Sequence, residues 1–421
     1  MNEVITVQPD KYLLSLFDRA VSAADPHQVL GQWLPDDTDR EAVVVGAGKA
    51  AASMAAALES HWRGRLSGLV VTRYGHGEPC AHIEVVEAAH PVPDDEGEKV
   101  ARRILQLVQG RREGDLVIFL VSGGGSSLLA LPAPGLTLAQ KQDINRQLLR
   151  SGAAIDEMNC VRKHLSAIKG GRLALACQPA TLMTYAISDV PGDLATVIAS
   201  GPTVPDPTTC ADALEILSRY RITAPQAVID WLHDEQAETP AMDAAAFANS
   251  SYQMIATPES ALRAAAEMAR NDGIEVIYLG ADIEGEAREV ARDQALLARE
   301  RLDAGQRCLI LSGGETTVTV TGSGRGGRNA EFLLALALEL DGVPGIHAIA
   351  ADTDGIDGSE DNAGALLAPG SLQRATALGL DAQAMLADND GYGFFHALGD
   401  LVFTGPTRTN VNDFRALLVI P

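Results

Sequence analysis

The sequence predicts an α/β protein of two domains, each a mainly parallel sheet flanked by helices. Short apolar segments alternate with amphipathic helical segments along most of the chain, which is typical of β-α-β crossovers. Hydrophobic residues make up 46% of the chain but aromatic residues only 4%, so the expected core is aliphatic, as in buried parallel sheets. A chain of 421 residues is also too long for one ordinary core.

The polar, alanine-rich stretch at 234–248 marks the expected boundary between one domain at 1–240 and a second at 241–421. In the first domain, the expected strands are 42–45, 68–72, 84–88, 116–121 and 181–187, and the expected helices are 11–23, 96–108, 138–151 and 159–176. In the second domain, the expected strands are 252–256, 275–279, 308–311, 346–351 and 416–420, and the expected helices are 258–271, 286–303 and 331–340.

Charge and composition exclude several classes of function. The formal net charge of -23 would repel nucleic acids and anionic membranes, so neither is an expected partner. No apolar run approaches the roughly 18 residues that a membrane span needs, and residues 1–10 do not resemble a secretory signal. The five cysteines are scattered and form no CxxC pair. We therefore expect reduced thiols in the cytoplasm, rather than a disulfide frame or a zinc site.

The segment Gly46-Ala47-Gly48-Lys49 follows an apolar strand and precedes a helix. Glycines there let the backbone approach an anion, and the helix start offers N–H groups and a positive dipole end. Lys49 would add a point charge suited to a phosphate or carboxylate. The segment is no Walker A loop, but it loosely matches the dinucleotide fingerprint, with Ala51 in the third glycine position and Arg73 where an acidic residue is expected. The alternative is a tight turn with a solvated lysine.

A second glycine-rich loop is Ser122-Gly123-Gly124-Gly125-Ser126, which also follows an apolar strand. Amide groups in such a loop can converge on an anion. Ser122 or Ser126 could instead be a nucleophile. However, the G-x-S-x-G elbow is absent and no histidine stands out as a partner base. We therefore expect a binding loop.

The densest basic patch holds four cations within eleven residues: Arg162, Lys163, Lys169 and Arg172. Within the expected helix 159–176, Arg162, Ser166 and Lys169 would share one face. The patch is a candidate site for phosphate or carboxylate groups. The alternative is a solvated helix face, although apolar residues between the charges indicate a half-buried helix.

Asp189 comes just after the apolar strand 181–187. An aspartate at that place could act as a general base or as a magnesium ligand. Aspartates that form turns before Pro-Gly are also common, so a purely structural role stays open.

The carboxyl-terminal half carries further polar clusters at expected strand ends. Arg325 lies in a nearly all-glycine loop, where its guanidinium could reach a phosphate. Asp352 and Asp354 resemble half of a calcium loop, but no glutamate follows at the twelfth position. Their place after strand 346–351 suits magnesium held by carboxylates and phosphate oxygens. The other candidate binding residues in this half are Glu315, Gly324, Asn329, Thr407 and Asn410.

Taken together in this order, these motifs resemble the glycerate kinases that carry a C-terminal MOFRL domain. That family also includes proteins named hydroxypyruvate reductases of tartrate utilisation. The resemblance extends over nearly the whole chain, from about Leu14 to Leu418. Besides the segments above, it rests on Arg162–Ser166, Lys169–Gly171, Ser188–Val190, Ser200–Thr203, Ser312–Thr316, Gly324–Asn329 and Asp352–Gly358.

The resemblance implies an ATP- and Mg2+-dependent kinase that phosphorylates D-glycerate at its 2-hydroxyl to give 2-phosphoglycerate. It implies a Rossmann-like kinase domain, a MOFRL domain and an active site in the cleft between them. Lys49 and Arg325 would then steady the transferred phosphoryl group, and Asp189 would orient or deprotonate the hydroxyl. Asp352 and Asp354 would hold magnesium. We expect a cytoplasmic enzyme, as a homodimer.

Two other functions remain as alternatives. An NAD(P)H-dependent hydroxypyruvate reductase would use the loose fingerprint at Gly46, with Arg73 on a 2′-phosphate. Against it, no clear histidine–acid pair for carbonyl protonation stands out, and several phosphate-type loops would have no role. A sugar-phosphate-sensing regulator is the third possibility, but no DNA-binding helix pair is evident and the net charge opposes one.

Overall fold

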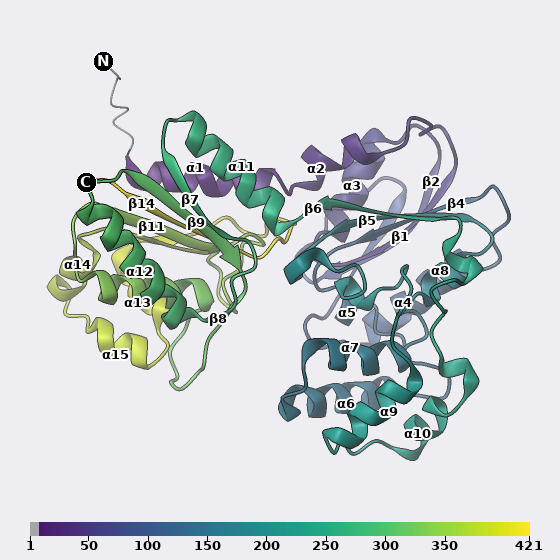
Figure 1. Cartoon of the computed structure of the whole chain (residues 1–421). Coiled ribbons are helices and arrows are strands. Elements are labelled where there is room, and N and C mark those ends of the chain that lie inside the picture. The colour runs from purple at the N-terminus through teal and green to yellow at the C-terminus, as the bar shows by residue number, and fades with distance from the viewer. Residues whose placement is uncertain (1–7) are drawn as a thin grey trace. The chain divides into compact units, whose positions relative to one another are not determined.

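The computed structural model describes residues 8–421, which form two compact units (Figure 1). One unit spans residues 26–255, and the other joins the described residues before Pro26 to residues 256–421. The division at residue 255 differs from the expected one at 240, because β6 (Ser250–Ala256) extends the first sheet beside β5 (Thr181–Ile187). The expectation of no secretory signal concerns residues 1–10, most of which lie outside the described residues.

The sheet of the 26–255 unit has the strand order β3-β2-β1-β4-β5-β6. Its other strands are β1 (Ala42–Ala47), β2 (Leu66–Arg73), β3 (Ile83–Ala88) and β4 (Leu116–Val121). β1 pairs in parallel with both β2 and β4, so the direction in which strands are added reverses between β1 and β4. In doubly wound sheets, ligands bind outside the carboxyl ends of the strands at this reversal.

Helices cover both faces of this sheet. α4 (Asp95–Val108) and α8 (Arg172–Cys177) share one hydrophobic core with alternate residues of β1, β2 and β4, and α3 (Ala51–His61) packs on the opposite face. The short helical segments of this unit are α2 (Pro26–Val29), α5 (Gly125–Leu128), η1 (Leu30–Trp33), η2 (Pro191–Asp193), η3 (Ile198–Ser200), η4 (Glu235–Ala237) and η5 (Ala245–Phe247). Every residue of β4 is buried, as expected for a central strand.

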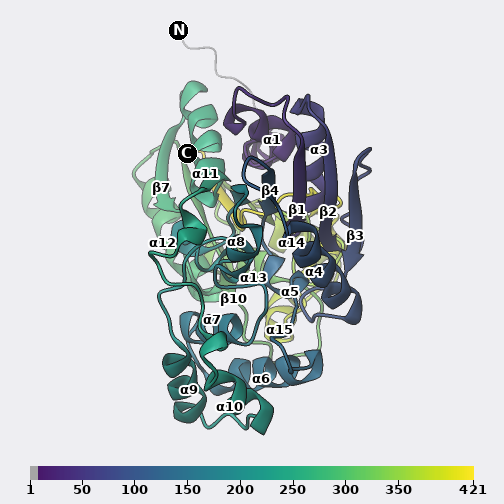
Figure 2. The same ribbon diagram turned by 90° about the vertical axis from the view of Figure 1, so that its right-hand side faces the viewer.

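Four helices of the same unit form a group beyond the sheet, which we call the helical group (Figures 1 and 2). They are α6 (Leu138–Ser151), α7 (Ile155–His164), α9 (Cys210–Arg219) and α10 (Gln226–Leu232). The group has a hydrophobic core of its own, made by residues such as Leu148, Val161 and Leu217.

The expected helix 159–176 is wrong. The chain forms α7, which ends at His164, and α8, which begins at Arg172. Between them, Gly170 and Gly171 have φ angles of 57° and 80°, a backbone region that side chains other than glycine rarely adopt. Lys169 therefore does not share a helical face with Arg162.

The other unit has a six-stranded sheet in the order β13-β12-β11-β14-β9-β7. Its strands are β7 (Glu275–Gly280), β9 (Cys308–Gly314), β11 (Ile346–Asp352), β12 (Gly364–Leu367), β13 (Leu401–Val402) and β14 (Asp413–Val419), with a separate pair β8 (Gly285–Glu286) and β10 (Thr316–Thr317). Only β7 and β9 pair in parallel within the six, and the other neighbours are antiparallel. The sheet is thus mixed, not mainly parallel as expected, because β14 inserts antiparallel between β9 and β11.

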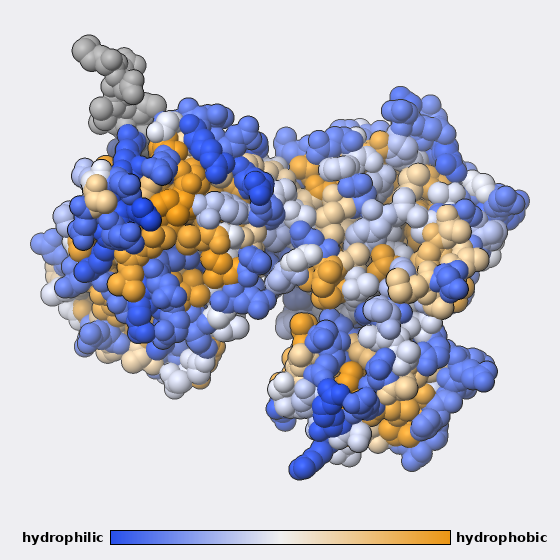
Figure 3. All heavy atoms as spheres, viewed as in Figure 1, coloured by the Kyte–Doolittle hydropathy of each residue, from blue (hydrophilic) through white to orange (hydrophobic). Residues whose placement is uncertain are grey.

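α1 (Pro9–Ser22) and α11 (Pro258–Asn271) pack together on one face of this second sheet, whereas α12 (Ala287–Asp303) and α13 (Arg328–Leu340) share the core of the other face. The remaining helices are α14 (Ser371–Ala377), α15 (Ala382–Ala387) and α16 (Gly391–Leu398). In the face shown in Figure 3, hydrophilic residues dominate, and a hydrophobic strip runs near the edge strand β7. In residues 8–421, no helix combines the length and apolarity that a bilayer crossing requires.

Candidate active site

The loops after β1 and β4 meet at the strand reversal and hold each other in place. Gly48 has a φ of 138°, and a Cβ added there would lie 2.2 Å from Ser122 Oγ. The Ala50 N–H donates to Ser122 Oγ at 2.9 Å, and the Lys49 N–H donates to the Gly123 carbonyl at 2.8 Å. Glycine at 48 is thus required for this close approach, and Ser122 acts as a joint between the loops, not as an exposed nucleophile.

The four backbone N–H groups from Gly48 to Ala51, in the turn that leads into α3, donate to protein acceptors. Those of Gly48, Lys49 and Ala51 donate to the carbonyls of Val71, Gly123 and Gly48, and that of Ala50 donates to Ser122. These four N–H groups are therefore engaged in this arrangement, and anion binding at this helix start stays a prediction. What the turn presents is the Lys49 side chain, which is half-buried.

Lys49 lies beside the second glycine loop and the end of β3. A Cβ added at Gly124 would lie 3.0 Å from the His90 imidazole and 3.4 Å from Lys49 Cγ. The segments that follow β3, β1 and β4 thus bring His90, Lys49 and Gly124 together. His90 belongs to no motif in the sequence, and only the fold places it here.

A cavity of about 210 Å³ opens between the second glycine loop and the helices α6 and α7. Its polar lining includes His90, Ser126, Lys141, Arg162 and Lys169. The glycine loop and two residues of the expected basic patch therefore meet in one site within the 26–255 unit.

Three cations converge on this cavity. Lys141 Nζ donates to the Leu165 carbonyl at 3.0 Å, and Lys169 Nζ donates to Ser126 Oγ at 2.8 Å. Arg162 Nε donates to Asn145 Oδ1 at 2.7 Å. All these acceptors are neutral, and within residues 8–421 no carboxylate forms an ion pair with any of the three.

The burial of these cations has a clear electrostatic effect. Desolvation, followed by repulsion from Arg162, lowers the pKa of Lys141 to about 7. Desolvation, followed by repulsion from Lys141 and Arg162, holds the pKa of Lys169 well below its usual value. Desolvation also lowers the pKa of Arg162. Buried charges are normally paired, so a bound anion would offset both the desolvation and the mutual repulsion.

The other two cations of the expected patch point elsewhere. Lys163 forms a buried ion pair with Asp206, with Nζ 3.1 Å from Oδ1, and Arg172 donates to the carbonyls of Gln236 and Ala237. The predicted binding role of Lys163 is therefore not supported by its position. Lys141, which completes the cavity, was missed because it comes from the separate helix α6 and belongs to no local motif.

Asp189 follows β5 and is half-buried. β5 pairs in parallel with β4, with Ala186 beside Val121, so Asp189 leaves the sheet at the same edge as Ser122. Ser188 Oγ and the Val190 backbone bond to each other and shape the turn. Asp189 therefore lies at the end of the sheet where the carboxyl ends of β4 and β5 meet, and its catalytic role stays a prediction.

The polar clusters of the other unit are tied together by an arginine that the sequence did not single out. Arg328 bonds to Asp413 at 2.8 Å, Asp352 at 2.9 Å and Glu315 at 2.6 Å. Asn329 Nδ2 donates to Asp413 Oδ1 at 2.8 Å. The structure thus brings the predicted residues Glu315, Asn329 and Asp352 into one network around Arg328.

Asp352 and Asp354 do not form a ready magnesium site. One oxygen of Asp352 pairs with Arg328 and the other accepts the Asp354 N–H at 3.0 Å, and an oxygen of Asp354 accepts the Ile356 N–H. Both oxygens of Asp352 thus already accept hydrogen bonds from protein groups. Magnesium binding by this pair stays a prediction that the observed contacts do not favour.

The remaining predicted residues of this unit also contact protein groups. Arg325 pairs with Glu360 and lies 4.3 Å from the ring centre of Tyr392. Thr407 donates to the Thr353 carbonyl, and Asn410 Oδ1 accepts the Asn412 N–H. Gly324 N–H donates to the Asp388 carbonyl.

Comparisons with known proteins agree along the whole chain. Residues 12–233 match the family model described as a domain of unknown function (DUF4147), and residues 308–413 match the MOFRL family. A protein of Agrobacterium vitis with the provisional name hydroxypyruvate reductase is 52% identical, over 98% of this chain and 95% of its own. The D-glycerate 2-kinase of Thermotoga maritima is 38% identical, over 97% and 98% of the two chains.

A crystal structure of glycerate kinase from Thermotoga maritima superimposes with a TM-score of 0.88 at 37% identity, covering 98% of this chain and 99% of the other. The human glycerate kinase is 34% identical over 96% of this chain and 92% of its own. Sequence similarity and fold are therefore shared over nearly the full length of the chain. The chain belongs to the glycerate kinase family with a C-terminal MOFRL domain.

Proposed function

We propose that the protein is a glycerate 2-kinase, which transfers the γ-phosphoryl group of ATP to the 2-hydroxyl of D-glycerate and forms 2-phosphoglycerate. The observation that carries this proposal is the convergence of Lys141, Arg162 and Lys169 on one cavity without a carboxylate partner among residues 8–421. Such a set of donors suits a small anion. Relatives named glycerate kinase support the choice of anion.

The size of the cavity favours glycerate over a whole nucleotide as its occupant. Its volume of about 210 Å³ lies below the roughly 300–1,000 Å³ of pockets for drug-sized ligands. We place the carboxylate of glycerate against Arg162 and the two lysines, which leaves its hydroxyls toward the glycine loop and Lys49. Ser126, which shares a hydrogen bond of 2.8 Å with Ser200, would contact the acceptor.

In this arrangement Lys49 stands where negative charge develops on the transferred phosphoryl group. Phosphoryl transfer depends on positioning and charge stabilisation more than on covalent chemistry, so an ammonium there lowers the barrier. Asp189 would orient the 2-hydroxyl or accept its proton. Magnesium, which neutralises phosphate charge in kinases, would arrive with ATP. The expected roles of Arg325, Asp352 and Asp354, the cytoplasmic location and the homodimer remain predictions.

Hydroxypyruvate reductase is the second candidate, favoured by the strand order and by the provisional name of the Agrobacterium vitis relative. A dinucleotide bound at β1 needs its pyrophosphate against free N–H groups at the helix start. Here Gly48, Lys49, Ala50 and Ala51 donate their N–H groups to protein acceptors. A dinucleotide at this turn could therefore not use these four N–H groups in the observed arrangement, which favours the kinase.

Phosphorus NMR of a reaction with D-glycerate, ATP and Mg2+ tests the proposal directly. The expected product is 2-phosphoglycerate, with no ATP consumed when glycerate or Mg2+ is omitted. Parallel reactions with hydroxypyruvate and NADH or NADPH are followed at 340 nm. Oxidation of the nicotinamide without ATP turnover would show that the protein is a reductase. Formation of 3-phosphoglycerate would retain the kinase but overturn the proposed regiochemistry.

A further inference from the structure

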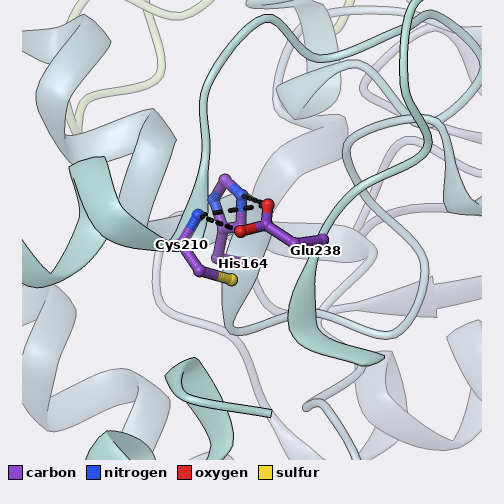
Figure 4. A group of neighbouring side chains, drawn as sticks. All are labelled: His164, Cys210 and Glu238. Atoms are coloured by element: carbon purple, nitrogen blue, oxygen red, sulfur yellow. Dashed lines mark hydrogen bonds and ion pairs between the residues drawn. The ribbon is translucent and has the colours of Figure 1, made fainter. Parts of the chain in front are cut away.

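Away from the cavity, the helical group brings together three side chains that can bind a metal. His164 is the last residue of α7, Cys210 is the first residue of α9, and Glu238 follows η4. Their ligand atoms lie within 4.8 Å of one another (Figure 4), and no other such group of three occurs among residues 8–421. Because the ligands come from three distant segments, no spacing motif in the sequence marks them.

The histidine is oriented as a metal ligand. His164 is fully buried, and its Nδ1 lies 2.9 Å from the Cys160 carbonyl oxygen. A carbonyl only accepts, so Nδ1 carries the proton and the lone pair of the neutral ring is on Nε2. Nε2 has no hydrogen-bond partner and faces Glu238, with Oε2 at 3.7 Å. Metal-bound histidines characteristically donate their other N–H to a carbonyl or carboxylate in this way.

Cys210 and Glu238 complete a set of three ligands that suits a borderline-soft metal cation. The Cys210 backbone N–H donates to both oxygens of Glu238, at 3.1 and 3.2 Å, which fixes the carboxylate beside the thiol. Arg172 donates to the carbonyl of Ala237 and so holds the neighbouring backbone. The Glu238 side chain is 48% exposed, which gives an ion and a bound water access from solvent.

We propose that His164, Cys210 and Glu238 bind Zn2+, with water as a fourth ligand. Imidazole, thiolate and carboxylate are the zinc ligands of proteins, and three of them plus water make a tetrahedral site. One thiolate and one carboxylate balance the charge of the ion. Because α7 also carries Arg162, an ion at the end of this helix would tie α7 to α9 and steady one wall of the cavity. The binding of the ion does not depend on the proposed reaction.

The test uses the full-length protein after dialysis against a chelator. We expect one equivalent of Zn2+ to bind in competition with a chromophoric chelator and to raise the melting temperature. Co2+ should give the near-ultraviolet absorption of a cobalt–thiolate bond. Cys210→Ser should abolish that absorption, and His164→Gln and Glu238→Gln should weaken Zn2+ binding at least about tenfold.

Cys160→Ser is the matched control, because Cys160 is a buried neighbour whose thiol faces the Thr209 carbonyl and whose own carbonyl is unaffected by the change. Glu238→Gln lies at an exposed position and should fold even where His164→Gln does not. The proposal is overturned if the wild type binds no stoichiometric Zn2+, or if Cys160→Ser removes the cobalt absorption while Cys210→Ser retains it. The proposal would also be overturned if the wild type and Glu238→Gln bound Zn2+ with equal affinity. The contact between His164 and Glu238 would then be only an ion pair between side chains.

Discussion

Ser122 Oγ accepts a hydrogen bond from the Ala50 backbone at 2.9 Å and would lie 2.2 Å from a Cβ at Gly48. One hydroxyl therefore joins the loops after β1 and β4 and fixes how closely they approach. This contact sets the position of Lys49 relative to the second glycine loop. The geometry of the proposed phosphoryl site thus depends on a buried hydroxyl that bonds to the protein backbone.

Gly48→Ala should disturb this junction and lower kcat strongly. The new methyl group meets Ser122, and the φ of 138° is strained for any side chain, at a cost of about 1–3 kcal/mol. The measurements are the melting temperature and the ATP- and glycerate-dependent rate. Gly110→Ala is the control, because Gly110 also has a positive φ, 70°, but a Cβ there meets nothing within 4 Å. A Gly48→Ala enzyme that matches Gly110→Ala in both readouts would show that the close approach is unimportant.

Binding of an anion in the cavity should take up protons at neutral to alkaline pH. The folded protein holds the pKa of Lys141 at about 7, below the usual value of about 10.4, and an anion beside it would raise that pKa. Affinity for glycerate should therefore fall as pH rises above 7. Calorimetry in two buffers of different ionisation enthalpy measures the uptake directly. Lys141→Met should reduce it, and Arg146→Met, an exposed change on the same helix α6, should not.

The same pKa makes a prediction for stability without ligand. Between pH 7 and about 10.4, Lys141 is protonated in the unfolded chain but neutral in the folded one, so the unfolded state binds more protons and stability rises with pH. Below pH 7 both states are charged, and this dependence ends. Urea unfolding across this range should show a smaller pH slope for Lys141→Met than for the wild type. An identical slope in both would contradict the assignment.

Arg328→Met should destabilise the carboxyl-terminal unit severely. Desolvation opposes the charge of Arg328, but Asp413, Asp352 and Glu315 raise its pKa. Removing it would leave the buried Asp352 without this ion pair and the buried Asp413 with Arg415 as its other cation. Breaking a buried pair in this way costs about 3–5 kcal/mol, which urea unfolding can measure.

Arg325→Met provides the comparison, since Arg325 lies three residues earlier and its side chain is 62% exposed in its pair with Glu360. An exposed pair contributes little to stability. If both variants lost equally little stability, the network around Arg328 would be a surface feature. If Arg325→Met kept its stability but lost kcat, the predicted catalytic role of Arg325 would gain support.

The sequence predicts the local elements well where one pattern governs a whole segment. The bounds of β4, β5, α6 and α11 coincide with the expected ranges, because their apolar spacing is uninterrupted. The expected helix 159–176 failed from Leu165 onward, where the chain bonds to residues 131–133 instead, and Gly170 and Gly171 then turn it at positive φ angles. The periodicity of β14 indicates a strand but carries no information on its direction, so the mixed second sheet was not foreseen.

The candidate site was only partly predictable for a related reason. Lys49, Ser126 and Arg162 stand in recognisable motifs, and the fold brings them to one end of the sheet. Lys141 and His90 reach the same place through tertiary packing alone. In the sequence, Lys141 is an ordinary lysine in a helix, and His90 simply follows a strand. A lysine in an amphipathic helix looks solvated in the sequence, and only burial against Arg162 and Lys169 distinguishes it.

Asp189→Asn should lower kcat at least about tenfold, because positioned acid–base groups contribute about 10²–10⁴-fold. If Asp189 accepts the hydroxyl proton, the deficit should shrink as pH rises, since hydroxide partly replaces the base. A magnesium ligand would instead show recovery with excess Mg2+, and a turn residue would show only a lower melting temperature.

Asp193→Asn is the control from the same turn, at a positive φ of 54° that asparagine tolerates. We expect a pH-dependent deficit without magnesium rescue; an active Asp189→Asn enzyme that melts early would make the residue structural.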